Sequence, residues 1–240
     1  ECLVGSEMCI RDSMSTCLWQ PDILSDGFEK TYVEMPDDYC GKVKCTVIRK
    51  KSDNKTTKAI LYVHGFSDYF FQKEMADMFT SSDYNFYAVD LRKYGRSFLE
   101  HHKLFQVRRL EEYFADIDAA LQIIKADGNR NVALLGHSTG GLTVSLYMEK
   151  KPSPMVKCLI LNSPFLDWNL SPFMRKFIMP VVAFLGKFFP DIKIHQKPDK
   201  GYAESLLKEY GGEWSYRKEW KPDILPDPDM GWARAIQKGQ

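Results

Sequence analysis

The stretch Val132-Ala133-Leu134-Leu135-Gly136-His137-Ser138-Thr139-Gly140 decides the fold that we expect of this sequence. Its first four residues are apolar and predict a short strand buried on both faces. A G-x-S-x-G motif comes immediately after them, and residues Leu142–Lys150 then show a helical pattern. Strand, tight turn and helix in this order are the setting in which a serine is presented as a nucleophile.

Ser138 is therefore the candidate nucleophile of this chain. Side chains beside the serine would clash in so tight a turn, and Gly136 and Gly140 supply the room. The serine oxygen is then expected at the carboxyl end of the strand, beside a helix N-terminus whose dipole favours developing negative charge. The alternative is an ordinary glycine-rich loop, because the motif by itself is short. The flanking strand and helix favour the nucleophile turn.

Strand and helix patterns alternate on both sides of this turn and predict an α/β fold with a mostly parallel sheet. An antiparallel hairpin is expected at the start of the sheet. The expected strands are Phe28–Met35, Val43–Arg49, Ala59–Val63, Tyr84–Val89 and Val156–Leu161, and the expected helices are Phe70–Phe79 and Glu111–Lys125.

The pattern changes after Phe165, where the chain becomes helical, rich in aromatic residues and interrupted by prolines. No further strand pattern comes after Leu161. Phe173–Phe189 is very apolar, but its longest uncharged run, Phe177–Gly186, is far shorter than the ~20 residues that a membrane-spanning helix needs. We expect a cap helix or a helix at a membrane interface here.

The loop His64-Gly65-Phe66-Ser67 directly follows a predicted strand. In a sheet of this kind, that loop donates a backbone N–H to the oxyanion hole, and the residue after the nucleophile donates another. The main-chain N–H groups of Phe66 and Thr139 are therefore the expected donors. His64 and His137 are expected to be structural residues that hold the loop and the turn, not to act as the base.

The segment Asp90–Ser97 predicts a turn at a strand end. Asp90 is expected to accept hydrogen bonds from loop N–H groups, and Arg92 is expected to form a local ion pair. Both roles are structural.

Composition excludes several classes of protein. The 240 residues include 33 Lys+Arg and 32 Asp+Glu, which gives a net charge of +1. A nucleic-acid-binding protein is expected to have a clear excess of basic residues, and this sequence has none. An apolar fraction of 44% with 13% aromatic residues excludes intrinsic disorder. Six cysteines without a C-x-x-C pair predict neither a disulfide scaffold nor a zinc ribbon. We expect reduced thiols in a cytoplasmic protein.

In these motifs the sequence resembles the α/β-hydrolase superfamily, and more narrowly its monoacylglycerol lipase and lysophospholipase branch, often described as serine aminopeptidase-like hydrolases. The resemblance covers about Phe28 to the C-terminus and is carried by His64-Gly65, Asp90–Ser97, Gly136–Gly140 and Asn162-Ser163-Pro164-Phe165. It implies hydrolysis of carboxylic esters through an acyl-enzyme, no metal or organic cofactor, and a helical cap. Ser67 and Asp68 depart from the Gly-Glu of many relatives, which leaves the details of the oxyanion loop open.

The resemblance also implies an acid and a histidine base after Ser138 along the chain. The one histidine in that part of the sequence is His195, which lies in the expected cap. Asp167 remains open as the acid because it lies after a predicted strand. We expect the triad acid and base to be absent from this chain, with the last strands missing, so that the chain is a C-terminally truncated and inactive fragment.

Three parts are expected along the chain. Residues 1–13 resemble a translated sequencing adapter, and we interpret them as an artefact. Residues 14–164 are the expected hydrolase core, and residues 165–240 the expected truncated cap.

The first functional hypothesis is a serine esterase acting on a small ester of the monoacylglycerol or lysophospholipid type. Cap aromatics would line an acyl pocket, contact a membrane peripherally or simply pack the cap; they are Phe173, Phe177, Phe184 and Phe188. An aminopeptidase or thioesterase on the same fold is the second hypothesis, and a non-catalytic binding protein the third. A dehalogenase is disfavoured because its nucleophile is Asp, not Ser138. No nucleic-acid partner is expected, and the oligomeric state stays open.

Overall fold

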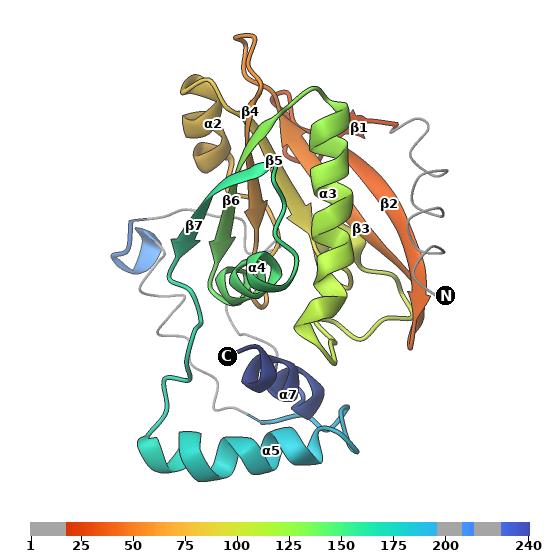
Figure 1. The fold of residues 1–240 in the computed structure, drawn as a ribbon, viewed down its shortest axis with the longest axis vertical. Coiled ribbons are helices and arrows are strands. Elements are labelled where there is room, and N and C mark those ends of the chain that lie inside the picture. The colour runs from red at the N-terminus through yellow and green to blue at the C-terminus, as the bar shows by residue number, and fades with distance from the viewer. Residues whose placement is uncertain (1–17, 196–207, 214–226) are drawn as a thin grey trace.

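The computed structural model describes residues 18–195, 208–213 and 227–240. Within them a seven-stranded sheet has the order β1-β2-β3-β5-β4-β6-β7 (Figure 1). The strands are β1 Gln20–Pro21, β2 Glu29–Asp38, β3 Gly41–Lys50, β4 Lys58–Val63, β5 Asn85–Asp90, β6 Asn131–His137 and β7 Val156–Asn162. The main helices are α2 Lys73–Ser81, α3 Phe114–Ala126, α4 Thr139–Lys150, α5 Met179–Leu185 and α7 Met230–Gly239, with short helical turns at Gly95–Ser97, Leu110–Tyr113, Met174–Ile178 and Lys208–Tyr210.

Strand directions confirm the predicted α/β sheet. Strands β5, β4, β6 and β7 are parallel, while β1, β2 and β3 continue the sheet on the β5 side in antiparallel pairing. β2 and β3 form the predicted hairpin. The two-residue strand β1 was not predicted, because so short a segment carries no periodicity.

Helices cover both faces of the sheet, which explains why the central strands are continuously apolar. In β4, Leu61 and Val63 belong to the core shared with α3 and α4, while Ile60 and Tyr62 belong to the core shared with α2. Figure 1 shows α3 and α4 on one face and α2 on the other. Since successive side chains of a strand point to opposite faces, both sets of residues are buried.

Two helix boundaries differ from the predicted ones for identifiable reasons. α2 begins at Lys73, not at Phe70, because the N–H of Phe70 donates to Asp90 Oδ1 at 2.9 Å and is held outside the helix. α4 begins at Thr139, earlier than Leu142, because the helix starts within the glycine turn itself. Glycine carries a weak helical propensity, so the sequence pattern placed the start too late.

Helices α5 and α7 lie side by side beyond the carboxyl ends of the strands (Figure 1). Gly186 makes this packing possible, because a Cβ there would overlap the carbonyl of Met230. In the described part of the chain after β7, Lys193 and Asp229 form an isolated bridge and no further strand is present. The division into a core to residue 164 and a cap from residue 165 stays a prediction, and residues 1–13 lie outside the described ranges.

Strand β7 has one hydrogen-bonded neighbour, β6, among the described residues. Its side chains are unusually exposed for so apolar a strand: Leu159 and Leu161 each keep 38% of their surface accessible. An unpaired apolar strand edge is a template for association between chains.

We predict that the 240-residue chain self-associates through β7. Leu159→Lys with Leu161→Lys should reduce the associated fraction, because charge on an edge strand opposes pairing. Leu104→Lys, at a residue that is 48% exposed away from β7, is the control. Light scattering after size-exclusion chromatography measures the mass. A monomeric wild-type chain that unfolds cooperatively would contradict the prediction.

Candidate active site

Ser138 lies between the end of β6 and the start of α4, in a strained conformation with φ 53° and ψ −120°. A residue with a side chain pays of order 1–3 kcal/mol for such a backbone. Hydrogen bonds on both sides maintain it: the Ser138 N–H donates to Asn162 O at 3.0 Å, and the Phe165 N–H donates to Ser138 O at 2.9 Å. The segment after β7 therefore holds the turn in place.

Gly136 and Gly140 allow this turn because other atoms occupy the space of their missing side chains. A Cβ on Gly136 would lie 2.6 Å from Val144 Cγ2 and 2.7 Å from Gly141 Cα. A Cβ on Gly140 would overlap the carbonyl oxygens of Val63 and His64. The first turn of α4 thus packs directly against the end of β4.

The loop after β4 lies against the serine. A Cβ on Gly65 would come within 3.0 Å of Ser138 Cβ and 3.3 Å of His137 O. The structure therefore brings together the two segments that the sequence analysis selected, residues 64–67 and 136–140. His137 ends β6 in register with Asn162.

His64 is 1% exposed and spans two loops. Its Nδ1 lies 2.8 Å from Gly65 O, and its Nε2 accepts the Leu91 N–H at 3.0 Å. An acceptor Nε2 requires a neutral ring whose proton is on Nδ1 and is donated to Gly65 O. The ring also packs on Tyr94, with centroids 4.7 Å apart. Both ring nitrogens are thus engaged in holding the Gly65 loop.

The two expected oxyanion donors lie in different elements, Thr139 at the start of α4 and Phe66 in the loop after β4. Thr139 is the first residue of α4, where a main-chain N–H has no partner within the helix. Phe66 is anchored by its ring, whose centroid lies 4.5 Å from Trp232 and 5.3 Å from Phe105. The contact with Trp232 places α7 over the loop, a neighbour that the sequence analysis missed because nothing in the local pattern relates residues so far apart.

The turn after β5 has the structural role expected of it. Asp90 accepts the N–H of Phe70 through Oδ1 and the N–H of Arg96 through Oδ2, and Arg96 also bridges Asp90 to Asp22. Burial acts to raise the pKa of Asp22, but the Arg96 guanidinium outweighs it and holds this pKa below its ordinary value.

Arg92 pairs with Asp116 on α3, at 2.6 Å, and not with a sequence neighbour as expected. Asp116 is fully buried, and burial raises its pKa although Arg92 opposes the rise. This pair ties the turn after β5 to α3.

The structure does not bring an acid and a base to Ser138 within the described residues. His195 pairs with Asp227, with Nδ1 2.7 Å from Oδ2, and its side chain is 87% exposed. No hydrogen bond joins His195 to Ser138 in these ranges. Asp167, which stayed open as the acid, pairs with Arg175.

The described residues contain no cluster of three or more His, Cys, Asp and Glu that could hold a metal ion. Among the helices in these ranges, none is both long and apolar enough to cross a bilayer.

Comparison with known proteins identifies the family. Residues 54–217 match the family described as serine aminopeptidase, S33. The chain belongs to this family. The match includes the turn at Ser138, the loop after β4 and the helix α5.

Two curated relatives are similar over part of the chain. Phospholipase YtpA of Bacillus subtilis is 29% identical over 118 residues, which are 49% of this chain and 44% of that protein. Epoxide hydrolase 4 of Mus musculus is 29% identical over 140 residues, which are 58% of this chain and 37% of that protein. The matched region therefore spans less than half the length of each relative.

Solved structures share the fold. A soluble variant of monoglyceride lipase from Saccharomyces cerevisiae aligns with a TM-score of 0.63 at 18% identity, over 93% of this chain and 71% of that one. The monoacylglycerol lipase of Paleococcus ferrophilus aligns with a TM-score of 0.59 at 22% identity, over 80% and 69%. The predicted α/β-hydrolase fold is confirmed.

We predict that Gly140→Ala destabilises the chain by about 2–3 kcal/mol, because the new methyl group overlaps rigid backbone carbonyls at the end of β4. Ser145→Ala, in the same helix, loses one hydrogen bond to Gly141 O and should cost about 1 kcal/mol or less. Urea unfolding measures both. Equal stability of the two variants would show that α4 can move away from β4 freely.

Proposed function

We propose that Ser138 is the nucleophile of a serine hydrolase that cleaves carboxylic esters. The observation that carries the proposal is the strained Ser138 at the N-terminus of α4, set against the Gly65 loop. In the first step Oγ attacks the ester carbonyl while a base takes its proton, and the alcohol leaves with that proton. Water then attacks the acyl-enzyme and releases the acid.

The negative charge that develops on the carbonyl oxygen needs fixed donors. We assign the main-chain N–H groups of Thr139 and Phe66 to this role, supported by the position of Thr139 in the first turn of α4. Gly136 and Gly140 give the turn its shape, and His64 and Gly65 position the Phe66 loop. Removing a donor of this kind costs an enzyme about 10²–10³ in kcat.

A substrate of the monoacylglycerol or lysophospholipid type is the version we favour. The name of the bacterial relative, a phospholipase, and the monoglyceride lipases among the solved structures support it. The family description favours a second candidate, an aminopeptidase, and a thioesterase would use the same acyl chemistry. A binding protein without catalysis is the third candidate, favoured by the pairing of His195 with Asp227 and not with Ser138 in the described residues.

We further propose that the 240-residue chain by itself is inactive, because the described residues show neither His195 nor Asp167 hydrogen-bonded to Ser138. His195 and Asp227 form an exposed pair on the cap, where solvent surrounds the ring and nothing directs it toward the serine. We also propose a reducing compartment such as the cytoplasm, which is supported by the free thiols of Cys40, Cys45 and Cys158.

Peripheral contact of the cap with a membrane is part of the proposal. The segment from Phe173 to Ile192 has one buried side and one exposed side. Met179, Ala183 and Gly186 are buried toward α7, while the larger apolar residues of the segment are exposed to solvent. The exposed residues are Phe173, Met174, Phe177, Ile178, Val181, Phe184, Leu185, Phe188, Phe189 and Ile192. Arg175, Lys176 and Lys187 lie in the same segment and suit anionic head groups.

Ser138→Ala should abolish labelling by a fluorophosphonate probe in the natural protein that carries this chain, and should lower ester hydrolysis by about 10⁴-fold or more. Ser163→Ala, at an exposed serine shortly after β7, should retain both the labelling and the ester hydrolysis. The 240-residue chain should show no more hydrolysis than its Ser138→Ala variant, with or without His195→Ala. Labelling that persists without Ser138 would refute the assignment.

Phe177→Ser with Phe184→Ser should weaken binding to vesicles of phosphatidylcholine and phosphatidylglycerol by about tenfold or more, because each exposed ring loses favourable burial in lipid. Tyr32→Ser, at a half-exposed aromatic residue on β2, should leave binding unchanged. Sedimentation with vesicles measures the bound fraction. Equal binding of both variants would contradict a membrane role for the cap.

A further inference from the structure

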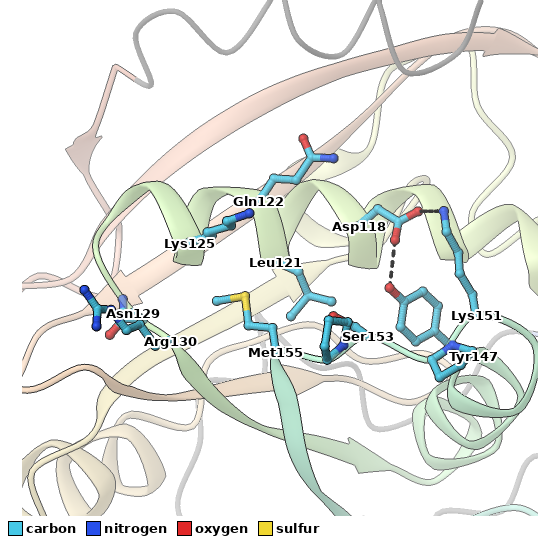
Figure 2. A pocket seen from close by; sticks show the side chains of 12 residues that line it. Asp118, Leu121, Gln122, Lys125, Asn129, Arg130, Tyr147, Lys151, Ser153 and Met155 are labelled. Carbon is cyan, nitrogen blue, oxygen red and sulfur yellow. Dashed lines mark hydrogen bonds and ion pairs between the residues drawn. The ribbon is translucent and has the colours of Figure 1, made fainter. Parts of the chain in front are cut away.

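A hollow opens at the other end of the sheet from Ser138. It has a volume of about 540 Å³ and lies at the amino ends of β6 and β7, between α3 and the connection from α4 to β7 (Figure 2). β6 has seven residues, and at roughly 3.3 Å per residue its two ends are roughly 20 Å apart. The hollow is therefore separate from the proposed catalytic site, and binding of a ligand there does not require Ser138 to be a nucleophile.

The floor of this hollow is apolar. Leu121 of α3 and Met155 before β7 lie next to each other in it (Figure 2), and Pro152 and Pro154 also line the hollow. Leu121 is 6% exposed and belongs to the hydrophobic core, and Met155, in the connection before β7, is partly buried and packs against that core. A volume of several hundred cubic ångströms is in the range of small-molecule sites.

Positive charge gathers at one end of the hollow. Lys125 of α3 and Arg130 before β6 both line it, and both are exposed; in Figure 2 Arg130 lies beside Asn129, and the Lys125 amine lies closer to Gln122. Neither side chain has an ion pair in the described part of the chain. The nearest carboxylate along the chain, Asp127, is already bound by Arg49.

At the opposite end of the hollow, the charges of Asp118 and Lys151 neutralise each other. Asp118 accepts the Tyr147 hydroxyl at 2.7 Å through Oδ1 and pairs with Lys151 through Oδ2. Asp118 is the one carboxylate of the lining, so two cations remain without a counter-charge. The lining thus combines an apolar floor with an excess of positive charge at one end.

We propose that this hollow binds an amphipathic anion, an aliphatic chain that ends in a single carboxylate. The carboxylate would lie between Lys125 and Arg130, which can donate charge-assisted hydrogen bonds to it. The chain would lie over Leu121 and Met155, toward the end where Asp118 and Lys151 neutralise each other. Both parts are needed, because surface cations alone bind carboxylates weakly in water.

The test is a calorimetric titration of the 240-residue chain with decanoate. Decanol, which lacks the charge, and acetate, which lacks the chain, should each bind about tenfold more weakly or not at all. Lys125→Gln with Arg130→Gln should weaken decanoate binding by about tenfold or more, since two charged hydrogen bonds are lost. Lys42→Gln, at an exposed lysine on β3, should change nothing.

A second variant tests the apolar half of the site. Met155→Asp adds a negative charge to the floor and should abolish decanoate binding, and thermal unfolding verifies that this variant is folded. Phe177→Ser, on the cap, should leave decanoate binding intact and so excludes the exposed cap as the site. Absence of decanoate binding, equal affinity for decanol, or unchanged affinity in the Lys125 and Arg130 variant would overturn the proposal.

Discussion

The structure depends on one close approach, the contact of the first turn of α4 with the end of β4. Gly140 lies so near the carbonyls of Val63 and His64 that any side chain would separate the helix from the strand. Because the helix starts there, Ser138 must turn back sharply at the end of β6, and its strained backbone is the result. The loop at Gly65 is brought against the serine by the same contact.

Buried polar groups then maintain the loops around this contact. His64 joins the loop after β4 to the turn after β5 through Leu91, and Asp90 holds that turn together with Phe70 and Arg96. The pair of Arg92 and Asp116 adds α3 to the same framework. Each group is desolvated, so each is costly without its partner, and the loops have few alternative arrangements. Rigid loops of this kind are what an oxyanion site requires.

The two ends of the sheet differ in character. At the carboxyl end lie the loops around Ser138, with α5 and α7 beyond the strand ends (Figure 1), and the large apolar side chains of residues 173–192 are mostly exposed. At the amino end, an apolar floor is open beside cations without partners. The ester chemistry that we propose belongs to the carboxyl end, and the binding of an acidic amphiphile that we propose belongs to the amino end.

The sequence by itself determined the alternation of strands and helices, the mostly parallel sheet with its antiparallel hairpin, and the turn at Ser138, because these arise from local periodicity and from glycine spacing. The partner of Arg92, the packing of Trp232 on Phe66 and the hollow between α3 and β7 were decided only by the tertiary structure. Each of these joins residues that are far apart along the chain. Local pattern carries no information on such contacts, since they arise only when the faces of separate elements meet and exclude water.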